Sequence, residues 1–159
     1  MPANVHTVYS NKHALVNLLP KIDLLIGAVL VVGAKAPKII NRDLLSIMSP
    51  GSVVVDVSVD QGGCIETTKP TTHKNPTFIE ENVTHYCVAN MPGAVPYTST
   101  VSLCNATFNY VKELANHGFD AFRNNNSLLK GLNVFQGKVT HPAVADCFGL
   151  EYTNPLKLL

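Results

Sequence analysis

The chain has 159 residues, 46% of them hydrophobic, and this length and apolar content suffice for one folded core. Its formal net charge is +1 without an evident Lys/Arg cluster, which argues against nucleic acid as a partner. The longest apolar run, Leu24 to Ala34, is too short to cross a bilayer, and the first residues lack a secretory signal, so we expect a cytoplasmic protein. The 4 cysteines include no C-x-x-C pair, and we expect reduced, buried thiols and no metal site.

A strand and then a helix are predicted near the start of the chain. Val5 to Tyr9 alternates weakly between apolar and polar residues, which is compatible with a short strand. Ser10 or Asn11 then offers the side-chain oxygen of a helix N-cap, and Pro20 ends the predicted helix.

A strand–helix–strand unit follows. The apolar run 24–30 indicates a buried strand, and Asn41 or Asp43 can cap a short helix that ends at Pro50. The β-branched run after Gly51 indicates a second strand, buried on both faces as in parallel sheets. This order is typical of a right-handed βαβ crossover.

Asp60 stands at the predicted exit of that second strand. In open α/β sheets ligands bind beyond the carboxyl ends of the strands, so Asp60 is a candidate for catalysis. The alternative is that its side chain only caps the following loop.

A polar loop, a third strand and a long helix are predicted next. The loop is 67–76, and the strand 85–90 places Asn90 at its carboxyl end. The helix starts at Thr98, Ser99 or Thr100 and stops at Gly118.

Shorter elements are predicted after the long helix. The residues 119–130 suggest short helical turns, 131–139 a hairpin-like passage, and 140–148 a helix with Pro142 in its first turn.

Three predicted strand ends, 29–30, 57–60 and 88–91, share one edge of the sheet. A flat and partly apolar ring such as nicotinamide suits an edge with apolar walls and a polar rim made by Asp60 and Asn90. An ordinary α/β core with polar strand ends is the alternative. The sequence has no G-x-G-x-x-G loop that would hold a pyrophosphate.

Four sequence blocks closely resemble NAD-dependent alanine dehydrogenase, and they are residues 26–37, 48–64, 70–73 and 86–100. The resemblance covers nearly the whole chain. It implies an α/β fold that is the second half of a Rossmann-type doubly wound parallel sheet, followed by a helical carboxyl-terminal segment of the catalytic domain. Residues 1–96 would form the partial NAD-binding domain and residues 97–159 the carboxyl-terminal segment.

The resemblance also implies roles for individual residues. Asp60 matches the catalytic aspartate that works in acid/base steps, and Asn90 matches an asparagine near the substrate and the nicotinamide. The positions that match NAD contacts are Ser10, Val29, Leu30, Val57, Ser58, Val59, Asp60, Val88, Ala89, Asn90 and Met91. The implied reaction is the reversible oxidative deamination of L-alanine to pyruvate and ammonia.

Part of the family's pattern is missing from this sequence. The glycine-rich loop, the acidic residue for the adenosine ribose, and the lysine and histidine that bind the substrate carbonyl have no counterpart. We therefore expect the chain to be inactive alone and to need the missing amino-terminal half as a partner. The resemblance implies a homohexamer for the complete enzyme.

Two other functions stay open. The first is the NAD(H)-binding subunit of proton-translocating transhydrogenase, which shares the fold. The second is a non-catalytic remnant that serves as an assembly module and buries Val101, Phe108 and Val111 of the long helix against a partner chain.

Overall fold

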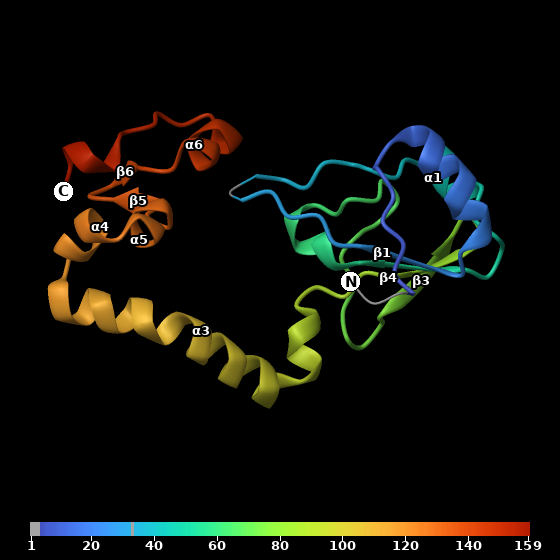
Figure 1. Cartoon of the computed structure of the whole chain (residues 1–159), viewed down its shortest axis with the longest axis horizontal. Coiled ribbons are helices and arrows are strands. Elements are labelled where there is room, and N and C mark those ends of the chain that lie inside the picture. The colour runs from blue at the N-terminus through green and yellow to red at the C-terminus, as the bar shows by residue number, and fades with distance from the viewer. Residues whose placement is uncertain (1–3, 33) are drawn as a thin grey trace. The chain divides into compact units, whose positions relative to one another are not determined.

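The computed structural model describes residues 4–32 and 34–159, which form two compact units (Figure 1). The first unit comprises residues 4–31 and 35–91, and the second comprises residues 32, 34 and 92–159. The elements of the first unit are α1 (Lys12–Leu18), η1 (Leu19–Lys21), β1 (Leu24–Gly27), α2 (Arg42–Ser46), β2 (Val53–Asp56), η2 (Val57–Gln61), β3 (Thr77–Glu80) and β4 (Val83–Tyr86). After η3 (Met91–Ala94) at the boundary come α3 (Pro96–His117), α4 (Asp120–Asn124), α5 (Asn126–Lys130), β5 (Val134–Phe135), β6 (Lys138–Val139), α6 (Pro142–Phe148) and η4 (Pro155–Lys157).

The first unit is built on a four-stranded sheet with the order β1-β2-β4-β3. Strands β1, β2 and β4 are parallel, and β3 runs antiparallel beside β4. The register sets Gly27 opposite Asp56 and Val55 opposite Tyr86. The predicted α/β class with a parallel sheet is confirmed.

Burial alternates along the strands of this sheet. In β2, Val54 and Asp56 are fully buried while their neighbours are only half-buried, and β1 leaves Leu24 52% exposed. The prediction of strands buried on both faces is therefore wrong for the described chain, because its hydrophobic core lies against one face of the sheet. The core residues are Leu19, Ala36, Ile40, Leu44, Leu45, Met48, Val54, Cys64, Ile65 and Val83.

Strand β2 ends earlier than predicted, at Asp56, and the chain continues as the 3-10 helix η2. The side chain of Asp56 accepts a hydrogen bond of 3.0 Å from the backbone N–H of Ser58 and so caps this helix. A local side-chain bond of this kind competes with strand pairing, which is why the β-branched run does not stay extended. Asp60 consequently lies within η2 and not at the end of a strand.

Three other strand predictions are corrected by the pairing. Residues 5–9 form no strand, because within residues 4–32 and 34–159 they pair with no neighbour. Strand β1 ends at Gly27, and β4 spans residues 83–86 rather than 85–90. Strand β3 was not predicted, and its tight turn into β4 holds Glu81 and Asn82 at positive φ.

The observed helix ends agree better than the strands with the sequence-based predictions. Asn11 and Asn41 cap α1 and α2 through their side-chain oxygens, as predicted. Helix α3 also ends at Gly118 as predicted, but it begins at Pro96, before the predicted threonine and serine caps. Proline favours this position because its φ is already helical and its missing N–H is not needed there.

Helix α3 carries an uncovered apolar surface within the second unit. None of its residues is buried, and Val101, Phe108 and Val111 are 43%, 63% and 59% exposed. Its last turns contact α4, and the amide of Asn125 donates a 2.8 Å hydrogen bond to Glu113. Among the described residues, no helix is both long and apolar enough to span a membrane.

Position 27 is expected not to tolerate even the methyl side chain of alanine in place of Gly27. A Cβ built on Gly27 would overlap the sulfur of Cys64, which belongs to the buried core. Gly27→Ala should therefore lower the free energy of unfolding by about 1–3 kcal/mol, as other overpacked cores do. Urea unfolding followed by circular dichroism measures this change.

Gly131→Ala is the matched control for this substitution. The Cβ on Gly131 would lie no closer than 3.4 Å to another group, and the residue has a helical φ of −84°. It should leave the stability within about 1 kcal/mol of the unsubstituted chain. Equal urea midpoints for Gly27→Ala and the unsubstituted chain would contradict the close packing of Gly27 against Cys64.

Candidate functional site

A pocket of about 340 Å³ lies directly beyond the ends of β1 and β2. Its walls come from the loop after β1 and from η2, so both elements leave the sheet at the same edge. The lining combines mainly apolar side chains with the carboxylate of Asp60, and it consists of Ala28, Val29, Leu30, Val57, Ser58, Asp60 and Gln61. This is the position at which parallel sheets usually bind ligands.

Ser58 joins the two walls of the pocket. Its hydroxyl donates to the carbonyl of Val29 and accepts from the N–H of Val29, both at 2.8 Å. Ser58 is 6% exposed, and its single O–H is fully used in this way. The side chain therefore fixes the loop after β1 against η2.

Asp60 and Asn90 lie together, although 30 residues separate them in the sequence. The backbone N–H of Asn90 donates a 3.3 Å hydrogen bond to Oδ2 of Asp60. Asn90 has a left-handed backbone with φ of 54°, a conformation that asparagine tolerates better than most residues. Asp60 lines the pocket but Asn90 does not, and Asn90 contacts Asp60 through its backbone amide rather than its side chain.

His73 is a third member of this cluster, and no role for it is predicted from the sequence. Its Nε2 lies 3.1 Å from the carbonyl oxygen of Asn90. A carbonyl oxygen only accepts hydrogen bonds, so Nε2 carries the proton and donates. The chain that results runs from His73 through the backbone of Asn90 to Asp60.

Asp56 is the buried anchor beneath the pocket, and it too was missed. Its carboxylate accepts hydrogen bonds from the N–H groups of Ser58, Cys64 and Ile65 and from the hydroxyl of Thr68, at 2.7–3.2 Å. The signal was visible as a carboxylate within an apolar β-branched run. Asp56 holds both ends of the segment that carries Asp60.

The other residues with implied NAD contacts do not line the pocket. Val59 and Val88 are buried, whereas Ala89 and Met91 are half-buried and flank Asn90. Ser10 is exposed just before α1 and does not line the pocket.

The cysteines differ in exposure from the prediction. Cys64 and Cys87 are buried, but Cys104 and Cys147 are exposed, and all four are free thiols. The prediction of buried thiols is therefore wrong for two of the four, which lie on helices with little cover. Burial raises the pKa of Cys87 from 9.0 to about 11, and burial followed by the charge of Asp56 raises the pKa of Cys64.

The raised pKa of Cys87 predicts a loss of stability in alkaline solution. Between pH 9.0 and about 11 the unfolded thiol loses its proton while the folded thiol keeps it. The unfolded state then binds fewer protons, so the free energy of unfolding falls as pH rises, by about 2 kcal/mol over this window. Urea titrations across the window, compared with Cys87→Ala, isolate this contribution from other groups. A fall of the same size in Cys87→Ala would contradict it.

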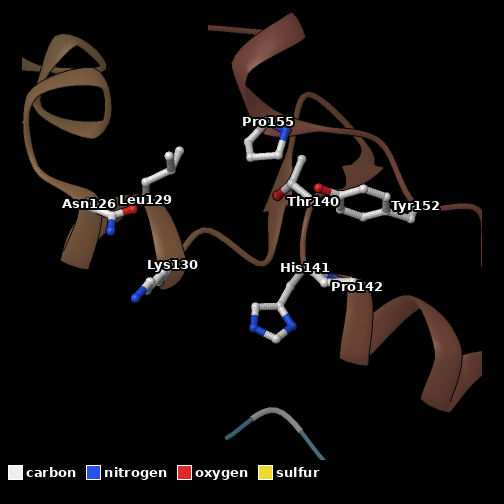
Figure 2. A pocket seen from close by; sticks show the side chains of 8 residues that line it. All are labelled: Asn126, Leu129, Lys130, Thr140, His141, Pro142, Tyr152 and Pro155. Carbon is white, nitrogen blue, oxygen red and sulfur yellow. The ribbon is translucent and has the colours of Figure 1, made fainter.

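A second pocket, of about 250 Å³, lies inside the second unit (Figure 2). Lys130 of α5 and His141, just before α6, contribute nitrogen atoms to its lining. Nδ1 of His141 is buried and has no hydrogen-bond partner. The remaining lining residues are Asn126, Leu129, Thr140, Pro142, Tyr152 and Pro155.

The first pocket suits the nicotinamide part of a dinucleotide. Val29, Leu30 and Val57 supply the apolar walls that a flat ring needs, and Asp60 supplies a carboxylate beside it. Within the described part of the chain, no group of three or more His, Cys, Asp or Glu residues could hold a metal ion.

Comparison with known proteins identifies the family. The profile described as "Alanine dehydrogenase/PNT, C-terminal domain" matches residues 1–142 of the 159. The chain belongs to this family. The resemblance to alanine dehydrogenase stated from the sequence is thereby confirmed, and the carboxyl-terminal domain of the family is its NAD-binding domain.

Individual relatives agree with this assignment. The chain is 55% identical over 154 residues to alanine dehydrogenase of Halomonas elongata and 48% identical over 156 residues to that of Mycobacterium tuberculosis. These alignments cover 96% and 98% of the chain but only 42% of each relative. The chain thus spans about two fifths of the length of these alanine dehydrogenases.

Two solved structures were compared with the chain, an alanine dehydrogenase and a transhydrogenase. An L-alanine dehydrogenase superimposes with a TM-score of 0.79 and 48% identity, covering 93% of this chain and 41% of that one. A transhydrogenase from Sinorhizobium meliloti superimposes with a TM-score of 0.51 and 28% identity, covering 56% of this chain and 25% of that one. The likeness to alanine dehydrogenase is higher on each of these measures.

Proposed function

We propose that this chain forms the nicotinamide side of an alanine dehydrogenase that catalyses the reversible, NAD-dependent oxidative deamination of L-alanine to pyruvate and ammonia. Five of the residues with implied NAD contacts, Val29, Leu30, Val57, Ser58 and Asp60, line one pocket. The observation that carries the proposal is the 3.3 Å contact between Asn90 and Asp60, which brings both implied catalytic residues to one place.

The chemistry assigns a proton-transfer role to Asp60. Bound NAD would supply the acceptor for the hydride of the α-carbon of alanine. Asp60 takes a proton from the substrate amine, and later assists the addition of water to the resulting imine by moving protons at the carbinolamine. Ammonia then leaves and pyruvate remains. Among the described residues none donates a hydrogen bond to Oδ1 of Asp60, so this oxygen is open to substrate.

The apolar walls have a separate task. The side chains of Val29, Leu30 and Val57 hold the ring by contact and keep water from one of its faces. Ser58 keeps the spacing between these walls by its paired bonds to Val29. Asn90 orients the carboxylate of Asp60 through its N–H.

Further parts of the proposal concern the whole enzyme. Residues 1–96 contribute to the NAD-binding domain and residues 97–159 to the catalytic domain, and an amino-terminal half supplies the remaining substrate contacts. The complete enzyme is a cytoplasmic homohexamer. The four free thiols support a reducing compartment, and the exposed apolar face of α3 supports burial against other parts of the assembly.

The test is a fusion of this chain to the amino-terminal part of the Halomonas elongata enzyme, joined where the two sequences begin to match. We expect the fusion to form NADH from alanine and NAD, measured by NADH absorbance, and the chain alone to form none. A folded fusion that binds NADH but does not oxidise alanine would contradict the proposal.

The transhydrogenase function is the weaker alternative, and the likeness of 28% identity over 56% of the chain supports it. It predicts hydride exchange between NADH and NADP by the same fusion, without any need for alanine. The assembly-module alternative is supported by the uncovered face of α3, and it predicts that the chain alone self-associates while the fusion stays inactive.

A further inference from the structure

We infer that His73 is a positioning residue for the carboxylate of Asp60, acting through the backbone of Asn90. The inference rests on the proposed function and adds to it a residue for which the resemblance implied no role. It follows from two consecutive hydrogen bonds, from His73 Nε2 to the carbonyl of Asn90 at 3.1 Å and from the N–H of Asn90 to Asp60 at 3.3 Å.

The loop that carries His73 is fixed beside Asn90. The N–H of Thr71 donates to the carbonyl of Cys87 at 2.9 Å, and the N–H of Ala89 donates to the carbonyl of Thr71 at 3.1 Å. These bonds form a short parallel bridge that ends one residue before Asn90 and two residues before His73. The imidazole therefore meets the carbonyl of Asn90 from a backbone that is already anchored.

The hydrogen bond from His73 to the carbonyl of Asn90 matters because the backbone of Asn90 is left-handed. The N–H that contacts Asp60 lies on one side of the Asn90 Cα, and the carbonyl that His73 holds lies on the other. Rotation about ψ of Asn90 is thus restrained by His73, and a residue with φ of 54° otherwise gains free energy by relaxing to a right-handed or extended conformation. Such relaxation also changes φ and would turn the N–H of Asn90 away from Asp60.

The matched variants are His73→Leu, His73→Asn and His73→Gln in the fusion enzyme. Glutamine places an N–H donor close to the position of Nε2, asparagine reaches only the position of Nδ1, and leucine has no donor. We expect kcat for alanine to fall about tenfold in the leucine and asparagine variants, because small displacements of a catalytic group cost factors of this size. The glutamine variant should recover to within about threefold of wild type, with KM for NAD unchanged within about twofold in all three. Lys74→Gln, an exposed substitution in the same loop, is the control.

A second measurement does not depend on activity. In the chain itself, the NMR signal of the Asn90 amide reports its contact with Asp60, and its hydrogen-exchange rate reports the strength of that contact. His73→Leu and His73→Asn should shift this signal and raise the exchange rate, and His73→Gln should restore both. If the wild-type fusion does not oxidise alanine, the proposed function fails while this measurement still decides the role of His73.

Two results would overturn the inference. One is an Asn90 amide signal and a kcat that are unchanged in His73→Leu. The other is a glutamine variant as impaired as the leucine variant with an equally lowered melting temperature, because that pattern marks His73 as a residue needed only for folding of its loop.

Discussion

Asp60→Asn in the fusion enzyme is expected to lower kcat for alanine by about 10²–10⁴, the range that a positioned acid/base group contributes. Asparagine has the shape of aspartate and keeps an oxygen for the N–H of Asn90, which is 3.3 Å from the carboxylate. It cannot exchange the proton that the amine and the carbinolamine require. The binding of NADH, measured by its fluorescence, should change little.

Asp43→Asn is the control for this variant. Asp43 lies exposed in the first turn of α2 and does not line the pocket. We expect its activity to equal that of the unsubstituted fusion. Alanine oxidation by Asp60→Asn within about twofold of the unsubstituted fusion would remove Asp60 from the mechanism.

Asp56→Ala should have the largest effect on stability. Three buried donors, the N–H groups of Ser58, Cys64 and Ile65, lose their acceptor in this variant, whereas the hydroxyl of Thr68 keeps the carbonyl of Ile65 at 2.8 Å. Buried donors without a partner cost about 1–3 kcal/mol each, and partial relaxation leaves an expected loss of about 3–5 kcal/mol. That is a large share of the stability of an ordinary domain, about 5–15 kcal/mol.

Urea unfolding of the chain measures this loss of stability, and two further variants serve as comparisons. Asp56→Asn should also destabilise the chain, because one face of its amide presents N–H groups to N–H donors. Asp60→Asn should not, since Asp60 is exposed and accepts a single hydrogen bond. A midpoint for Asp56→Ala equal to that of Asp60→Asn would show that the four bonds do not hold the first unit together.

The helix ends were the part of the fold that local sequence could predict. Asn11 and Asn41 cap α1 and α2 with their own side chains, and Gly118 ends α3, because capping depends on residues within one turn. The strands were harder to predict. The length of β4 depends on its pairing with β2 and on the turn at Glu81 and Asn82, and neither is a property of residues 85–90 alone.

The residues of the candidate site also differ in how far the sequence could predict them. Asp60 and Asn90 could be singled out as polar residues after apolar runs, and the resemblance to alanine dehydrogenase then implied their roles. His73 and Asp56 could not be assigned in this way. The role of His73 depends on the carbonyl of Asn90. That of Asp56 depends on backbone N–H groups and a hydroxyl 2–12 residues away, and these groups come together only when the loops fold around them.

The sequence by itself determined the α/β class, the family and the cofactor expected of that family, and it singled out Asp60 and Asn90 as candidate site residues. These follow from composition, residue order and family motifs, which do not depend on knowing any contact. The tertiary structure decided that Ser58 joins η2 to the loop at Val29, and that Asn90 meets Asp60 through its backbone. These features required folding because hydrogen bonds between distant segments take shape only after the sheet has set their distance and register.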